Sequence, residues 1–247
     1  MKYIPIEEEI KWWRKERGTK KQLPLKHHFA HSCIRSRLYD TLIALGCNSH
    51  SLILDVGCGS GEDAMYVQKV SENIIGVDIA TVALRRFVSK GFQGVLANAE
   101  KLPLHNNSFD YVISSGLLHH LIGQGDLKEY LEEFVRVTRG GGYVIALEPN
   151  LFHLSGILMN VLNTIKPGII GLVPHERAQS PLHLTRVFTV AGLENVKCAS
   201  ASYTWNRFPL SVSKFISKHE DNIRFEKPFN MLGWFVIVYG QKREAIK

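Results

Sequence analysis

The stretch that decides the fold is Leu52-Ile53-Leu54-Asp55-Val56-Gly57-Cys58-Gly59-Ser60-Gly61. An apolar run that ends in a glycine is typical of a buried strand, and the closely spaced glycines predict a tight turn into a helix. Gly57, Gly59 and Gly61 allow positive φ and let a ligand approach the backbone. The helix that follows offers free N–H groups and the positive end of its dipole. We therefore expect a ligand site at this junction.

The spacing of residues in this loop limits the class of ligand. A dinucleotide-binding loop has the spacing G-x-G-x-x-G, and Glu62 stands where its third glycine would fall. A carboxylate there would repel a pyrophosphate, and no Gly-Lys-Ser/Thr follows, as it would in a nucleoside triphosphate loop. Asp55 suits a zwitterionic ligand that carries a sulfonium and an ammonium. Asp78, 23 residues after Asp55, can accept hydrogen bonds from both ribose hydroxyls.

Outward from this loop, short apolar strand patterns alternate with helical patterns. This alternation predicts an α/β fold with parallel strands and right-handed crossovers. Strands are expected at 51–56, 73–78, 92–97, 109–115, 143–148, 193–203 and 231–241. Helices are expected at 62–70, 81–90, 127–138 and 182–191, with a turn at Gly140-Gly141-Gly142.

Three segments lie outside this alternation. Residues 1–47 are expected to form an N-terminal helical extension, with helices at 6–18 and 28–45, ahead of a main domain at 48–247. The segment at about 151–180 is apolar in its first part, where Lys166 is the one formal charge up to residue 174. It is interpreted either as helices packed on the body or as a lid over the site. With a charged insertion at 205–230, it is expected to form a cap over the carboxyl ends of the strands.

With further landmarks, the chain resembles a known family. It is similar to the class I S-adenosylmethionine-dependent methyltransferases, in particular the broad small-molecule group called type 11, from about residue 50 to 150 and again at 182–204. The landmarks are Leu54 to Gly61, Gly76-Val77-Asp78-Ile79, Asn98-Ala99-Glu100-Lys101-Leu102-Pro103, Ser108-Phe109-Asp110, Leu118-His119-His120-Leu121 and Arg139-Gly140-Gly141-Gly142. The resemblance implies a Rossmann-like, doubly wound, seven-stranded sheet with the last strand antiparallel. It also implies S-adenosyl-L-methionine as cofactor and S-adenosyl-L-homocysteine as product.

The resemblance also implies roles for individual residues. Asp55 and the loop residues Gly57, Cys58, Gly59 and Gly61 should hold the methionine part of the cofactor. Asp78 should bind the ribose, with Ile79 beside the adenine. Asn98, Ala99 and Glu100 should line the adenine end, although the family usually has Asp where Asn98 stands; Asn keeps an acceptor oxygen. Ser114 and Ser115 should lie beside the sulfonium.

Candidate residues for the acceptor side follow the fourth and fifth strands. His119 and His120 come after the fourth strand, and either is a candidate base, because histidine titrates in a suitable range and a base helps when the acceptor must lose a proton. Both can instead pack or cap the following turn. Glu148 ends the fifth strand and is interpreted as a contact to a substrate hydroxyl or amine, or as a salt bridge or helix cap.

Composition excludes several classes of protein. Cys33, Cys47, Cys58 and Cys198 show no C-x-x-C or zinc-finger spacing, so reduced thiols in a cytoplasmic protein without a metal are expected. The start has no apolar core of a signal peptide, and no stretch of about 18 apolar residues predicts a transmembrane helix. The net charge of +7 is concentrated early, at 11–26, and a solvated helix face is favoured there over contact with a membrane surface or nucleic acid.

The sequence therefore predicts an enzyme that transfers a methyl group by direct displacement. Its acceptor is expected to be a small molecule, with apolar or lipid-like compounds among the candidates. One alternative is a nucleic-acid methyltransferase, which the basic segment supports, although the Asn/Asp-Pro-Pro-Tyr/Phe tetrapeptide of base-amino methyltransferases does not follow the fourth strand. The other is a non-catalytic module that only binds the cofactor, since binding is not catalysis. The oligomeric state is open.

Overall fold

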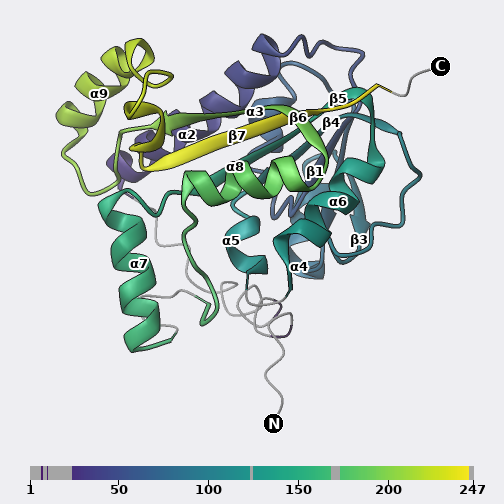
Figure 1. Ribbon diagram of the computed structural model, residues 1–247, viewed down its shortest axis with the longest axis horizontal. Coiled ribbons are helices and arrows are strands. Elements are labelled where there is room, and N and C mark those ends of the chain that lie inside the picture. Colours follow the sequence, from purple (N-terminus) through teal and green to yellow (C-terminus); the bar gives the residue numbers. More distant parts are fainter. Residues whose placement is uncertain (1–6, 8–9, 11–23, 123–124, 168–172, 245–247) are drawn as a thin grey trace.

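The fold is a sheet of seven strands covered by helices on both faces (Figure 1). The computed structural model describes residues 7, 10, 24–122, 125–167 and 173–244. The strand order is β3-β2-β1-β4-β5-β7-β6, and β7 alone runs antiparallel to its neighbours β5 and β6. The strands are β1 (Ile53–Val56), β2 (Ile74–Asp78), β3 (Gln93–Leu96), β4 (Phe109–Ser115), β5 (Thr138–Pro149), β6 (Leu193–Ser202) and β7 (Phe235–Lys242). The expected doubly wound sheet with an antiparallel last strand is confirmed.

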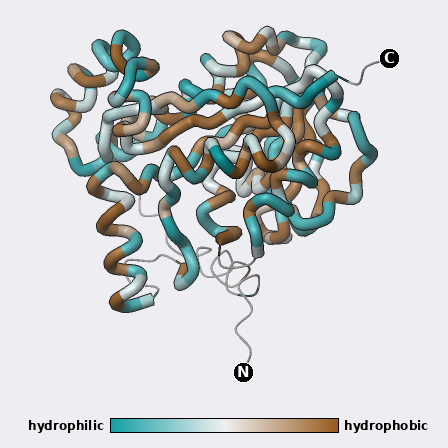
Figure 2. Tube along the Cα trace, viewed as in Figure 1, coloured by the Kyte–Doolittle hydropathy of each residue, from teal (hydrophilic) through white to brown (hydrophobic). Residues whose placement is uncertain are grey.

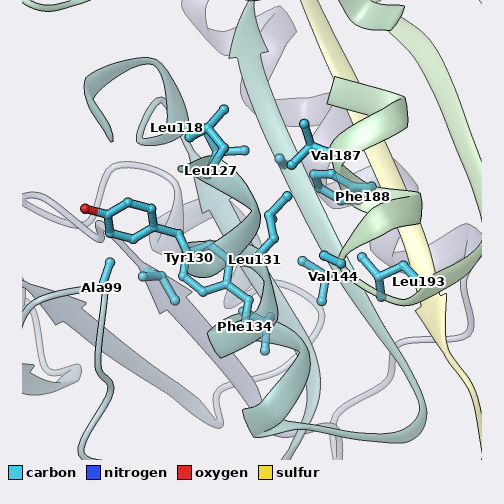
Figure 3. Packing of buried hydrophobic residues seen from close by; sticks show 14 of the residues in the cluster. Ala99, Leu118, Leu127, Tyr130, Leu131, Phe134, Val144, Val187, Phe188 and Leu193 are labelled. Atoms are coloured by element: carbon cyan, nitrogen blue, oxygen red, sulfur yellow. The ribbon is translucent and has the colours of Figure 1, made fainter. Parts of the chain in front are cut away.

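The helices form two layers, one on each face of the sheet. The described helices are α2 (Leu25–Ala44), α3 (Ala64–Val67), α4 (Thr81–Ser89), α5 (Leu118–Leu121), α6 (Leu127–Val137), α7 (Leu154–Ile165), α8 (Pro181–Val190) and α9 (Leu210–His219). Short 3₁₀ helices are η3 (Glu220–Asn222) and η4 (Phe229–Met231). One apolar cluster joins the sheet to α5, α6 and α8, and a second joins the opposite face to α2, α3 and α4. Figure 3 shows Leu131 and Phe134 of α6 and Phe188 of α8 on the face that also carries Val144 of β5.

The strand order places a ligand crevice beside β1. From β1 the chain crosses outward to β2 and β3, and then returns to the other side of β1 to form β4. In such sheets the crossovers leave in opposite directions at this point, so a crevice opens at the carboxyl ends of β1 and β4. The glycine loop leaves β1 at that edge.

Several boundaries differ from those expected. The helix expected at 62–70 is reduced to α3, because turns occupy most of the segment that follows the glycine loop. The strand expected from Met231 begins at Phe235, after η4. The run Gly140–Gly142 lies within β5 rather than in a turn. A Cβ on Gly142 would stand 2.6 Å from the carbonyl oxygen of Asp110, so glycine lets β5 approach β4 closely there.

The N-terminal extension is only partly described. Helix α2 begins at Leu25, directly after Pro24, and its Ile34, Leu38 and Leu42 are buried. The helix expected at 6–18 and most of the basic segment fall outside the described residues. The division into 1–47 and 48–247 stays a prediction. No helix in the described part of the chain is both long and apolar enough to cross a membrane.

Candidate cofactor and acceptor site

The loop after β1 depends on three glycines, which lack side chains. Gly57, Gly59 and Gly61 have φ of +75°, +51° and +84°, which L side chains rarely adopt. A Cβ on Gly57 would meet the side chain of Leu117 at 3.0 Å, and one on Gly61 would meet Phe87 at 2.9 Å. The loop therefore keeps a backbone surface against which a ligand can lie.

Asp78 ties this loop to the end of β2. Its Oδ2 accepts the backbone N–H of Gly59 at 2.9 Å, and its Oδ1 accepts the backbone N–H of Ala80 at 2.7 Å. The side chain is buried. A carboxylate oxygen can accept more than one hydrogen bond, so holding the loop and accepting ribose hydroxyls are compatible roles for Asp78.

Asp55 is a buried carboxylate that lacks a full set of partners. The residue is 1% exposed, and its buried Oδ2 has no hydrogen-bond partner. Burial raises the pKa of Asp55 well above its usual range, and the negative charges of Asp63 and Asp78 raise it further. A cationic ligand at this place would remove both the repulsion and the missing hydrogen bond. The ammonium and sulfonium expected from the sequence fit this site.

Arg35 is the cation that the structure brings to this acidic cluster. Its Nε lies 3.4 Å from Oδ1 of Asp63, and both residues line a cavity of about 150 Å³ between α2 and the ends of the strands. The cavity is also lined by His31, Ile34, Ser115, Gly116 and Phe235. Burial raises the pKa of Asp63, while Arg35 and a hydrogen bond from Ser115 lower it in part. The cavity thus offers both a carboxylate and a guanidinium to a zwitterion.

His119 and Glu148 form a dyad beside this cavity. The Nδ1 of His119 lies 2.7 Å from Oε2 of Glu148. The Oε1 of Glu148 accepts the backbone N–H groups of Leu117 and Leu118, at 3.0 and 2.8 Å, and Oε2 accepts that of His119 at 3.3 Å. Since a carboxylate oxygen accepts, this contact is a hydrogen bond when Nδ1 of His119 carries a proton.

The three acceptor-side candidates, Glu148, His119 and His120, differ in their surroundings. Glu148 is fully buried, and its carboxylate holds the start of α5 and the ring of His119 in place. His119 points its ring edge toward Gly116, where a Cβ would lie 3.7 Å from its Cε1, and Gly116 lines the cavity. His120 instead pairs through Nδ1 with Glu176 at 3.3 Å, on the segment that follows α7. His119 is therefore the better candidate for a base.

Comparisons with known proteins agree with this geometry. A family model described as a methyltransferase domain matches residues 54–146, which run from Leu54 in β1 to Ala146 in β5. A solved S-adenosylmethionine-dependent methyltransferase from Thermotoga maritima superposes with a TM-score of 0.66, at 19% identity, over 89% of this chain and 92% of that chain. The fold is that of the class I S-adenosylmethionine-dependent methyltransferases, and residues 54–146 match their methyltransferase domain. S-Adenosylmethionine is the cofactor of this family.

The curated relatives share the domain and differ in activity. A tRNA (carboxymethyluridine(34)-5-O)-methyltransferase of Arabidopsis thaliana is 38% identical over 98 residues, which are 39% of this chain and 24% of that protein. The mitochondrial arginine-hydroxylase NDUFAF5 of Rattus norvegicus is 30% identical over 143 residues, 57% of this chain and 40% of that protein. The chain thus spans less than half the length of these relatives.

The remaining cofactor residues expected in a class I methyltransferase occupy the edge beside β2 and β4. Asn98 closes a turn in which its Oδ1 accepts the backbone N–H of Glu100 at 3.1 Å and its Nδ2 reaches Oε2 of Glu100 at 3.2 Å. Ser114 is buried, and its Oγ has no hydrogen-bond partner. The other members of this group are Ile79, which is partly exposed at the end of β2, Ala99 and Cys58, which are buried, and Ser115, which lines the cavity.

Sequence reasoning missed two residues that the structure brings to this candidate site. Asp63 stands two residues after Gly61, the last glycine of the motif, so its position was a usable signal. Arg35 is 20 residues before Asp55, and only the packing of α2 across the strand ends brings it to Asp63. Among the described residues, no three His, Cys, Asp or Glu side chains gather as a metal site.

Proposed function

We propose that the protein transfers the methyl group of S-adenosylmethionine to a small acceptor, with apolar or lipid-like molecules as the leading candidates. The observation that carries this proposal is the buried, unpartnered Oδ2 of Asp55 beside a loop of three positive-φ glycines. A carboxylate held in this way is stabilised by a cation, and the cofactor of this family carries two.

Three groups of residues are assigned to the three parts of the cofactor, which are the amino-acid end, the ribose and the adenine. Asp55 and Asp63 take the ammonium, and Arg35 takes the carboxylate of the methionine end, since the cavity presents both charges. Asp78 accepts the ribose hydroxyls, and the turn at Asn98 borders the adenine. When bound, the cofactor supplies an electrophilic methyl group, and the protein contributes proximity and alignment.

His119 is assigned the removal of the acceptor's proton. The Nε2 of this ring takes the proton from an acceptor hydroxyl or amine as the new bond to carbon forms. Glu148 holds Nδ1 at 2.7 Å and so fixes the tautomer that a base requires. Acceptors that carry no proton at the reacting atom would not need this dyad.

The cofactor assignment is tested by calorimetry with two ligands. S-Adenosylhomocysteine contains the amino-acid end, whereas 5′-methylthioadenosine lacks it. Asp78→Ala should weaken both ligands, while Arg35→Met should weaken only S-adenosylhomocysteine, by roughly tenfold or more for one lost charge-assisted bond. Equal effects of Arg35→Met on both ligands would remove Arg35 from the amino-acid site. The absence of binding to the wild-type protein would overturn the proposed function.

The acceptor class is tested by following the methyl group. The protein is incubated with cell extract and S-adenosylmethionine that carries a tritiated methyl, and the products are separated by solvent extraction. Label in small solvent-extractable or water-soluble molecules is expected. His119→Ala should abolish most of this transfer while keeping cofactor affinity, and Glu148→Gln should reduce it and change its pH profile. Cofactor binding without any transfer would indicate a non-catalytic module.

RNA methylation is the second candidate function. The identity to a tRNA methyltransferase of Arabidopsis thaliana and the basic residues between 11 and 26 favour it. Label that nuclease treatment releases, together with RNA affinity that falls steeply with salt, would replace the small-acceptor proposal with this one.

A further inference from the structure

Helix α7 is oriented with its polar residues inward. Asn163 is fully buried, and its Nδ2 donates to the carbonyl oxygens of Val173 and Glu176, at 2.9 and 3.1 Å. Asn160 exchanges two hydrogen bonds with the backbone of Ala178, at 2.8 and 3.1 Å. The asparagines thus fasten the returning segment 173–178 to the helix, and they use the face that a globular protein normally makes apolar.

The opposite face of α7 consists of exposed aliphatic side chains. Figure 2 shows this helix as a largely hydrophobic segment that extends away from the body of the molecule. The outer face comprises Leu154, Ile157, Leu158, Val161 and Ile165, which are 56%, 46%, 43%, 48% and 76% exposed. A contiguous apolar surface of this kind on a soluble domain marks an interaction site.

The chain around this face is free of acidic residues. From 149 to 175 there is no Asp or Glu, and Lys166, directly after the helix, is the one Lys or Arg. The five side chains of the outer face are aliphatic, and the exposed Thr164 beside them donates its hydroxyl to the carbonyl oxygen of Asn160 at 2.7 Å, within the helix. A specific protein interface usually includes aromatic anchors and directional polar contacts, which this face lacks, so it suits a fluid apolar phase better.

Cationic groups lie at the other end of the helix. His153, the residue before α7, contacts the ring of Trp205 edge-on, with centroids 5.4 Å apart. Arg207, two residues after Trp205, is exposed. Burial lowers the pKa of His27, and the charges of Lys26 and Arg207 lower it further, which places these groups near one another at the start of α2. Positive charge therefore borders both ends of the outer face.

We propose that the outer face of α7 docks on the surface of a bilayer that contains anionic phospholipids. The aliphatic side chains enter the boundary between headgroups and acyl chains, while Lys26, Arg207 and Lys166 face the headgroups. The net charge of +7 has the sign required for this attraction. The helix lies along the surface and does not cross it. The docking does not depend on methyl transfer.

The test is flotation of the full-length protein with vesicles in the absence of cofactor. Vesicles of phosphatidylcholine with about one third phosphatidylglycerol should bind the protein, and pure phosphatidylcholine should bind it more weakly. The double variant Leu158→Gln/Val161→Gln should lose roughly tenfold in vesicle affinity. Because both side chains are exposed, the fold should be retained, which circular dichroism checks. The matched control is Val88→Gln/Leu96→Gln, at equally exposed positions on α4 and β3, and should bind as the wild type does.

Three outcomes would overturn the proposal. The first is a wild-type protein that floats with neither vesicle. The second is equal binding by the α7 variant and the wild type, which would leave a purely electrostatic attachment through another surface. The third is a dimer, seen by light scattering, that the α7 variant dissociates, because a second copy of the chain would then cover the outer face.

Discussion

Replacing Asp55 with Asn should make the ligand-free protein more stable and make it bind cofactor less well. Asp55→Asn keeps the shape of a side chain that is 1% exposed and removes its charge. The substitution removes the cost of burying an unpaired charge and the repulsion from Asp63 and Asp78, and leaving a buried charged group without a partner costs at least about 1–3 kcal/mol. We therefore expect the free energy of unfolding to rise by about 2 kcal/mol, or roughly 4–8 °C in Tm for a chain of this length.

The same substitution removes a charged acceptor for the cofactor's ammonium. A hydrogen bond to a charged group contributes about 1.5–3 kcal/mol, so the Kd for S-adenosylhomocysteine should rise roughly ten- to a hundredfold. Thermal unfolding monitored by circular dichroism and calorimetric titration measure the two effects. A lower Tm, or an unchanged Kd, would refute the assignment of Asp55 as a strained carboxylate that the ligand relieves.

The pH dependence of the Tm difference and a control substitution at a second aspartate extend this test. Because the folded pKa of Asp55 is raised, its charge destabilises the protein above that pKa, and this cost disappears as pH falls through it. The difference in Tm between Asp55→Asn and wild type should therefore shrink as pH falls. Asp110→Asn is the matched control. Asp110 is also buried, but it accepts the backbone N–H of Leu52 at 2.6 Å and pairs with Arg139, so removing its charge should lower the Tm.

Three further predictions follow from other contacts. Gly57→Ala should lower stability by about 1–2 kcal/mol, measured by urea unfolding, because φ is +75° and the Cβ would press on Leu117 at 3.0 Å; wild-type stability would contradict this. Arg37→Ala should cost about 3–5 kcal/mol, because it leaves the buried Glu220, 2.9 Å away, without its cation; a loss below about 1 kcal/mol would mean that the pair contributes little. Burial, together with the positive charge of Arg35, lowers the pKa of His31 to about 4. About 3 kcal/mol of stability should therefore be lost as pH falls from 6.5 toward 4, and His31→Gln should flatten that limb of the pH profile.

The central sheet could be predicted because local patterns decide it. The run Ile53 to Gly61 combines strand, turn and helix signals in nine residues, and Asp78 repeats the strand-end acid one crossover later. Boundaries failed where long-range contacts override local preference. The glycines at 140–142 belong to β5 because the strand passes close to Asp110, and no pattern in the sequence reports that distance.

The strand-end residues of the candidate site could be proposed from the sequence, but Arg35 on helix α2 could not. Glycines and acids on strand ends are fixed in place by the sheet, so their spacing reveals their proximity. Arg35 reaches the site through the packing of a helix, which spacing does not encode. Glu148 was interpreted either as a substrate contact or as a salt bridge or helix cap, and the three backbone N–H groups and His119 around its carboxylate agree with the second interpretation. The orientation of α7 was also hidden, since an apolar helix is normally expected to pack inward.

The insertion of β7 between β5 and β6 has a consequence for synthesis of the chain. Strand β6 forms its sheet hydrogen bonds with β7 alone, and β7 is made more than thirty residues after β6 is complete. Until then β5 and β6 both present unpaired backbone edges, which are the surfaces through which chains aggregate. A nascent chain that stalls before Phe235 is therefore expected to be a substrate for chaperones, because the sheet can close only once β7 has been made.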